Sequence, residues 1–226
     1  MVKINISIDG PSSSGKSSIA ANLASLLSYK YVNTGSMYRA VTYCCLRENM
    51  FEKKFCHNKL KIILSKMKLN YSYNNESKSS ILIINGKNVS KYLNTIDVTD
   101  NVSFISKIKD VRLKLIEIQR NYAKDKGVVM EGRDIGTVVL PNADVKFFIQ
   151  TDIDTRVKRR FMQLKSNNIN VDFSDLKKRI IKRDKIDSER ELSPLKLPEG
   201  AFLISNNTSD FNSVLNEIYD IVKSFL

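Results

Sequence analysis

The chain has 226 residues, 42% of them hydrophobic, which suits one α/β domain with an insertion and a substantial core. Its first residues enter a strand pattern and a glycine-containing loop at once, so we expect no signal peptide. No apolar run approaches the ~18 residues of a spanning helix, so we expect no membrane partner. Lysine, asparagine and isoleucine recur throughout the chain, so the formal net charge of +13 reflects a general bias more than a nucleic-acid-binding face.

The first predicted elements enclose a phosphate-binding loop, or P-loop. Ile4–Ile8 reads as a strand and Ser18–Leu27 as an amphipathic helix, and the segment between them fits G-x-x-x-x-G-K-[ST]. In this motif backbone N–H groups and the helix N-terminus surround a phosphate chain, the lysine reaches the β- and γ-phosphates, and the final hydroxyl ligates Mg²⁺. We therefore predict a nucleoside triphosphate site, with Ser17 as metal ligand, made of Gly10, Pro11, Ser12, Ser13, Ser14, Gly15, Lys16, Ser17 and Ser18.

A different pattern covers residues 66–94. Leu69, Tyr71 and Tyr73 alternate with polar residues, which is the period of a half-buried strand. Asn85-Gly86 is the strongest short hairpin signal. Together these signals predict a small antiparallel meander with a strand around Tyr71, a polar turn at Asn75–Ser79, a strand at Ile81–Ile84 and a short strand at Lys87–Val89.

Elsewhere strands and helices alternate along the chain. The predicted elements are the strand Tyr29–Asn33, an apolar helix to about Asn49, a helix from about Ile105 to Lys124, the strands Gly127–Met130 and Val145–Ile149, a basic helix from about Asp154, a charged helix over Ser174–Asp187 capped by Ser174, the strand Ala201–Ser205 and a helix over Phe211–Phe225. Five strands alternating with helices imply a parallel sheet with right-handed crossovers. We therefore predict an α/β core over 1–65 and 100–226 and an inserted subdomain over 66–99.

A P-loop alone does not separate kinases from GTPases or motor ATPases. The chain contains no N-K-x-D, so guanine recognition of the GTPase type has no carrier. It contains no D-x-x-G either, because the residue three before each glycine is never Asp. These absences argue against a regulatory GTPase.

The arginines add a second phosphate-binding signal, because a guanidinium grips phosphate at two points. Arg39, Arg133, Arg183 and Arg190 lie just beyond strand ends or on charged helices, and ligands of open α/β sheets bind at the carboxyl edge. Two triplets each share a helical face, Arg183/Asp187/Arg190 and Arg156/Arg159/Arg160. Each triplet alone is typical of a solvated surface. Beside a P-loop, they predict two phosphate-bearing ligands that meet under a basic, mobile cover.

Several segments, in this order, resemble bacterial cytidylate kinases from about Ile4 to the final helix. They are Ile8-Asp-Gly-Pro with Gly-Lys-Ser, Asn33-Thr-Gly-Ser-Met-Tyr-Arg39, Asp110-Val-Arg112, Glu131-Gly-Arg-Asp-Ile-Gly-Thr-Val-Val139 and Arg183-Asp…Asp187…Arg190. The resemblance implies a P-loop kinase core, a β insert that binds the monophosphate, and a helical lid at about 152–172. Asn33 and Glu131 depart from the family pattern, in which Asp is usual at both positions.

The resemblance also implies a reaction and its site. ATP would give its γ-phosphoryl group to CMP, and we expect also to dCMP, in pyrimidine nucleotide metabolism, with Mg²⁺ accompanying ATP. Lys16, Arg133 and Arg190 would be catalytic. The residues implied at the CMP phosphate and ribose are Thr34, Arg39, Arg133, Arg183, Asp187 and Arg190. Three cysteines without zinc spacing favour reduced thiols, so we expect a cytoplasmic protein, and nothing in the sequence requires an oligomer.

Base recognition and the lid follow from the same resemblance. A carboxylate at Asp134, aided by Ser103, suits the exocyclic amino group of cytosine, and the Arg112 fork suits its acceptors. Uracil would place an acceptor against Asp134. The lid over ATP would carry Arg156, Arg159 and Arg160.

Two other functions remain open from the sequence. One is a P-loop kinase that acts on a different nucleotide or on a metabolite. The other is a basic nucleic-acid-binding ATPase, although the chain lacks an aromatic-interleaved basic strand or a known RNA module. Stimulation of ADP release by RNA, and by no monophosphate, would favour the second.

Overall fold

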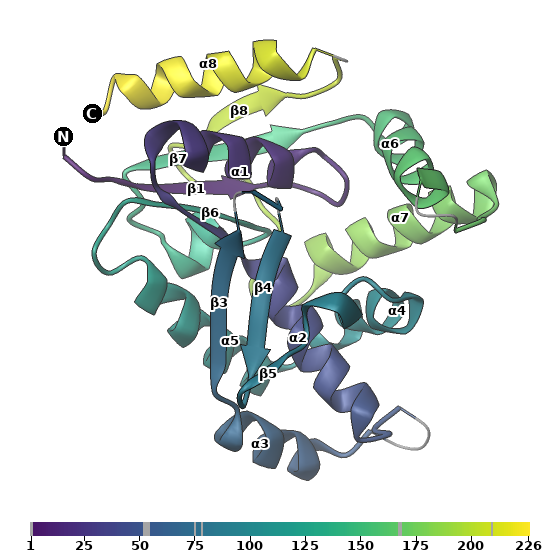
Figure 1. The fold of residues 1–226 in the computed structure, drawn as a ribbon. Helices are drawn as coiled ribbons and strands as arrows, with labels where there is room; N and C mark the ends of the chain where they lie inside the picture. Colours follow the sequence, from purple (N-terminus) through teal and green to yellow (C-terminus); the bar gives the residue numbers. More distant parts are fainter. Residues whose placement is uncertain (1, 52–54, 75, 78, 167–168, 209) are drawn as a thin grey trace.

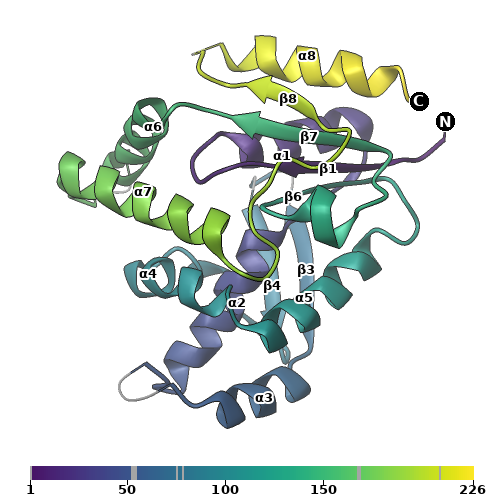
Figure 2. The same ribbon diagram turned by 180° about the vertical axis from the view of Figure 1, so that it is seen from behind.

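The computed structural model describes residues 2–51, 55–74, 76–77, 79–166, 169–208 and 210–226, which form a layered α/β fold with a second, smaller sheet (Figures 1 and 2). The larger sheet has five strands in the order β2-β6-β1-β7-β8, and every neighbouring pair is parallel. Its strands are β1 (Asn5–Asp9), β2 (Lys30–Asn33), β6 (Val128–Gly132), β7 (Val145–Gln150) and β8 (Phe202–Ser205). The predicted five-stranded parallel sheet is confirmed.

Helices cover both faces of this sheet. On one face lie α1 (Lys16–Leu27) and α8 (Phe211–Lys223), and on the other lie α2 (Thr34–Arg47) and α5 (Lys109–Tyr122). The helices α6 (Ile153–Ser166) and α7 (Phe173–Glu189) pack against each other beside the sheet and share a small core of their own (Figures 1 and 2). In β6, Val129 belongs to the core formed with α1 and α8, whereas Val128 and Met130 belong to the core formed with α2 and α5. Successive side chains of a strand point to opposite faces, so an all-apolar strand is buried on both sides.

The second sheet is antiparallel, in the order β3-β4-β5. The elements of this region are α3 (His57–Lys66), β3 (Leu69–Asn74), β4 (Ser79–Ile84), β5 (Lys87–Asn88), the short 3₁₀-helix η1 (Ser90–Tyr92) and α4 (Ile96–Ile105). Asn85 and Gly86 have φ of 49° and 80°, the conformation that a two-residue hairpin turn requires, so the predicted hairpin is confirmed. Within the predicted polar turn at Asn75–Ser79, Asn75 and Lys78 lie outside the described residues.

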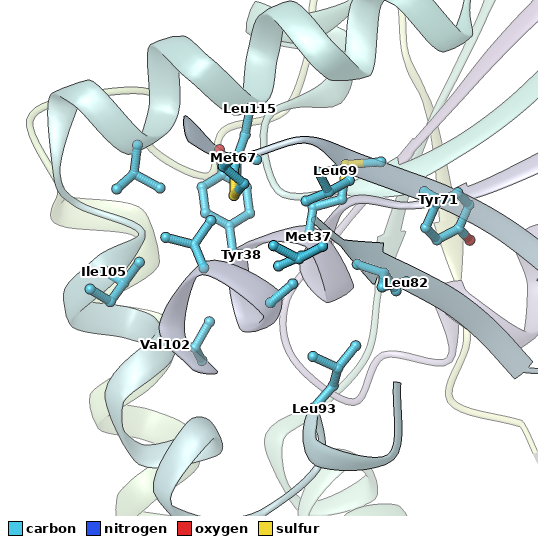
Figure 3. Close-up of a cluster of buried hydrophobic side chains, with 14 of the residues drawn as sticks. Met37, Tyr38, Met67, Leu69, Tyr71, Leu82, Leu93, Val102, Ile105 and Leu115 are labelled. Carbon is cyan, nitrogen blue, oxygen red and sulfur yellow. The ribbon is translucent and has the colours of Figure 1, made fainter. Parts of the chain in front are cut away.

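The small sheet shares a hydrophobic core with the helices beneath it (Figure 3). Leu82 of β4 and Leu69 of β3 belong to the same buried cluster as Met37 of α2 and Leu115 of α5. Because α2 begins directly after β2, this packing ties the inserted sheet to the carboxyl edge of the larger one.

Two helix predictions need correction, and two helices were not predicted. The helix predicted from Ile105 to Lys124 is wrong at its start, because α4 ends at Ile105 and α5 begins at Lys109. At the break, Ser106 Oγ donates to Ser103 O, and Ser106 O accepts from Arg112 instead of continuing a helix. Neither α3 nor α4 was predicted. The N-cap of α7 is Asp172, whose carboxylate accepts from the Asp175 N–H at 2.9 Å, and not Ser174.

Candidate active site

The P-loop lies between β1 and α1 at the carboxyl edge of the sheet. A Cβ on Gly10 would lie 2.5 Å from the Ile149 carbonyl oxygen, and one on Gly15 would lie 2.4 Å from Asn206 Nδ2. Both glycines also have positive φ, at 154° and 90°. Asn206 Nδ2 donates to the Ser14 carbonyl at 2.7 Å and so holds the loop from the end of β8.

Lys16 is the first residue of α1 and is only 5% exposed. Its Nζ donates to the Pro11 carbonyl at 3.0 Å and lies 3.9 Å from Oε2 of Glu131. Burial, and then the positive charge of Arg133, lower the pKa of Lys16 to about 7. A bound phosphate would supply negative charge and favour the ammonium form, so this lysine is suited to a polyanionic ligand.

Glu131 joins β6 to the P-loop. Its Oε1 accepts from Ser17 Oγ at 2.7 Å and from the Tyr31 hydroxyl at 3.3 Å. Hydroxyl and carboxylate oxygens are ligands that Mg²⁺ accepts, so Ser17 and Glu131 form a donor set that fits this ion. Across the described part of the chain, no three His, Cys, Asp or Glu side chains gather as a metal site.

Several arginines share the cleft with Lys16. Arg39 donates to the Leu93 carbonyl and to Thr99 Oγ1, both at 2.9 Å. Burial and then the charge of Arg183 lower the pKa of Arg39 to about 9, and burial and then Arg133 lower that of Arg183 to about 10. Partly buried cations that depress one another's pKa values gain most from an incoming anion.

One carboxylate lies among these cations. Asp187 is 4% exposed, accepts from Arg133 Nε at 3.0 Å, and lies 4.0 Å from Arg183 Nε and from Arg190 Nη1. Burial raises the pKa of Asp187, but the three arginines outweigh it and hold the value below its ordinary range. With more cations than carboxylates, the cluster remains suited to a phosphate.

Arg112 and Asp134 form a buried ion pair at the base of the cleft. Arg112 also donates to the Ser106 carbonyl at 3.0 Å and to Ser193 Oγ at 3.2 Å. Arg190 Nη2 approaches the other oxygen of Asp134 at 3.4 Å. Two of the three residues predicted to read cytosine, Arg112 and Asp134, are therefore partners of each other.

The three arginines of α6 have different surroundings. Arg156 pairs with Asp184 of α7 and donates to Thr151 O at 3.0 Å, which ties α6 to α7 and to the residue that follows β7. Arg159 Nη2 donates to Thr208 O at 2.9 Å, beside the P-loop. Arg160 faces the same cleft as Lys16.

The cleft has a volume of about 1090 Å³ and receives most of the predicted site residues. Those that line it are Ser12, Ser13, Lys16, Ser17, Ser18, Thr34, Arg39, Ser103, Arg112, Arg133, Asp134, Arg160, Arg183, Asp187 and Arg190. The predicted residues that do not line it are Gly10, Pro11, Ser14, Gly15, Arg156 and Arg159.

Sequence reasoning missed Asp9, which directly precedes the P-loop. Its fully buried carboxylate accepts from the N–H groups of Ile135 and Gly136, each at 2.8 Å. Burial raises the pKa of Asp9 to about 7. An acidic residue at the end of the strand that leads directly into the P-loop was a signal available in the sequence. Asn206 and Tyr31 were missed as well, and their contacts with Ser14 and Glu131 have no local sequence signal.

A parallel sheet with a P-loop after β1, and a second cationic cluster in the same cleft, define a P-loop kinase. The shikimate kinase of Bacteroides thetaiotaomicron shares this fold, with a TM-score of 0.52 at 9% identity over 98% of this chain and 99% of that one. An uncharacterised protein from Eubacterium ventriosum has a TM-score of 0.55 at 16% identity over 98% and 99% of the two chains.

The model of the family described as cytidylate kinase matches residues 6–224. The cytidylate kinase of Flavobacterium johnsoniae is 41% identical over 99% of both chains. That of Anoxybacillus flavithermus is 42% identical over 98% of this chain and 96% of its own. The chain therefore belongs to the cytidylate kinase family, whose members are nucleoside monophosphate kinases. Within the described residues, no helix has both the length and the apolar character needed to cross a membrane.

Proposed function

We propose that this enzyme transfers the γ-phosphoryl group of ATP to CMP and dCMP, forming CDP or dCDP and ADP, in cytoplasmic pyrimidine metabolism. The observation that carries the proposal is one cleft lined by Lys16 of the P-loop and by Arg39, Arg133 and Arg183. The P-loop suits a triphosphate, and the arginines suit a second phosphate. The relatives at about 40% identity are cytidylate kinases, which supports CMP as the acceptor.

The reaction needs alignment more than proton transfer. The attacking oxygen of a nucleoside monophosphate is already an anion near neutral pH, so no general base is required. The enzyme must hold two polyanions in line and keep water away from the transferring group. Lys16, Arg133 and Arg190 would neutralise charge at that point, and their positions are set by α1, β6 and the end of α7.

The donor site would combine the P-loop with the lid. The backbone from Gly10 to Ser18 would surround the phosphates, and Arg156, Arg159 and Arg160 would close over ATP. Mg²⁺ bound with ATP supplies charge neutralisation at the β- and γ-phosphates. Ser17 and Glu131 would hold it.

The acceptor site would take CMP beneath the lid helices. Arg39, Arg183 and Arg190 would bind its phosphate, with Thr34 nearby, and Asp187 would accept from the ribose hydroxyls. Asp134 and Ser103 would accept from the cytosine amino group, and Arg112 would donate to the ring acceptors. The Arg112–Asp134 pair supports this assignment because each group fixes the other's orientation before the base arrives.

The test is a panel of acceptors. MgATP is mixed separately with CMP, dCMP, UMP, AMP and RNA, and ADP release is measured, with Lys16→Ala as the inactive control. We expect strong stimulation by CMP and dCMP and much weaker stimulation by UMP and AMP. Stimulation by RNA alone would overturn the proposal.

A further inference from the structure

Within the described residues, hydrogen-bond donors reach only one of the two oxygens of the Glu131 carboxylate. Both hydroxyl donors, from Ser17 and Tyr31, bind Oε1. The other oxygen, Oε2, lies 3.9 Å from Lys16 Nζ, at the outer limit of an ion pair. The carboxylate therefore stands beside the P-loop lysine without closing onto it.

A glutamate side chain has one methylene more than an aspartate side chain, so its carboxylate can move by rotation about one additional bond. Both Glu131 and Lys16 are nearly buried, at 3% and 5% exposed, so a closer contact between them would be weakly screened by water. Such a contact would compete with a phosphate for the Lys16 ammonium. An anchor on Oε1 opposes that movement.

Tyr31 is built to be this anchor. Its side chain is 6% exposed, and its ring meets the ring of Tyr73, from β3 of the inserted sheet, edge-on at a centroid distance of 4.6 Å. A ring that is buried and packed in this way has little freedom to move its hydroxyl away from Glu131.

We propose that Tyr31 is a positioning residue, which holds the Glu131 carboxylate on Ser17 and away from Lys16 so that the lysine stays free for the donor phosphates. The inference rests on the proposed function for its kinetic consequence. It adds a residue of β2, in contact with the inserted sheet, to the apparatus that prepares the P-loop.

The test compares Tyr31→Phe with Tyr29→Phe. Both variants lose one hydroxyl and keep the ring, but the Tyr29 hydroxyl accepts from the Ile4 N–H, away from Glu131. ATP affinity is measured by calorimetry in EDTA, and KM for ATP and for CMP are measured with Mg²⁺. We expect Tyr31→Phe to weaken ATP binding about fivefold or more in both settings. KM for CMP should stay within about twofold, and Tyr29→Phe should leave ATP binding unchanged.

A double variant tests whether Tyr31 acts through Glu131. Glu131→Gln removes the charge that could pair with Lys16, so adding Tyr31→Phe to the Glu131→Gln variant should change ATP affinity in EDTA by less than about twofold. An equal loss in both backgrounds would overturn the proposal, as would unchanged ATP affinity in Tyr31→Phe or equal changes for ATP and CMP. Failure of the proposed function would look different, since the unmodified enzyme would then not phosphorylate CMP while the binding comparison in EDTA still reported on Tyr31.

Discussion

Replacing Lys16 by methionine should make the ligand-free protein more stable while it destroys turnover. The side chain is 5% exposed, and the fall of its pKa from 10.5 to about 7 corresponds to a penalty of roughly 5 kcal/mol on the charged form. Loss of the contacts to Pro11 and Glu131 offsets part of the gain, so we expect a net increase in unfolding free energy of about 1–3 kcal/mol at pH 7. Turnover should fall by a factor on the order of 10²–10³.

The gain in stability should also depend on pH with a definite sign. Because the folded-state pKa of Lys16 is lowered, the wild type loses stability as pH falls through about 7 and recovers it towards 10.5. The advantage of Lys16→Met should therefore be largest near pH 6.5 and shrink by pH 9.5. Urea unfolding at several pH values measures it, with Lys30→Met, an exposed lysine of β2, as control. A variant that is less stable at every pH, or that keeps near wild-type turnover, would refute the reasoning.

Three further changes probe the acceptor side and the buried acid. Arg190→Lys should lower kcat/KM for CMP at least tenfold, because an ammonium cannot reproduce the guanidinium fork that reaches Ser193 O and Asp134. Kinetic constants equal to wild type would indicate that Arg190 forms only a surface ion pair, which contributes about 0–1 kcal/mol. Asp134→Asn should lower the ratio of kcat/KM for CMP to kcat/KM for UMP, by an amount equivalent to about 1–3 kcal/mol of discrimination. Any loss that both substrates share because the pair with Arg112 is broken cancels in this ratio. An unchanged ratio would mean that cytosine is read elsewhere. Because burial raises the pKa of Asp9 to about 7, its stabilising contribution is complete below pH 3.8 and is lost as pH rises through 7, so Asp9→Asn should remove that part of the pH dependence of the urea midpoint.

The features that could be predicted from the sequence are those with a local cause. The spacing of Gly10, Gly15 and Lys16 belongs to one loop, and Asn85-Gly86 encodes its own turn through two positive φ angles. The alternation at Leu69, Tyr71 and Tyr73 reflects burial of one face of β3, on which Tyr71 contacts Tyr122 of α5 and Tyr73 contacts Tyr31 of β2.

The errors have non-local causes. The break between α4 and α5 depends on Arg112, whose guanidinium takes the Ser106 carbonyl that a continuous helix would use. The pairing of Arg112 with Asp134 joins a residue on α5 to one that follows β6, and the contact of Tyr31 with Glu131 joins the neighbouring strands β2 and β6. Helix periodicity and motif spacing carry no information about partners that are distant in the sequence, so these contacts could be identified only in the three-dimensional structure.

The central claim is that the phosphoryl group passes from ATP to CMP inside a cleft that excludes water. ATP labelled at its γ-phosphorus is incubated with Mg²⁺, CMP and the enzyme, and the labelled products are separated. The account predicts that the label appears in the β-phosphate of CDP in a one-to-one ratio with ADP, with little labelled inorganic phosphate. Label that appears mainly in inorganic phosphate, whether or not CMP is present, would contradict it.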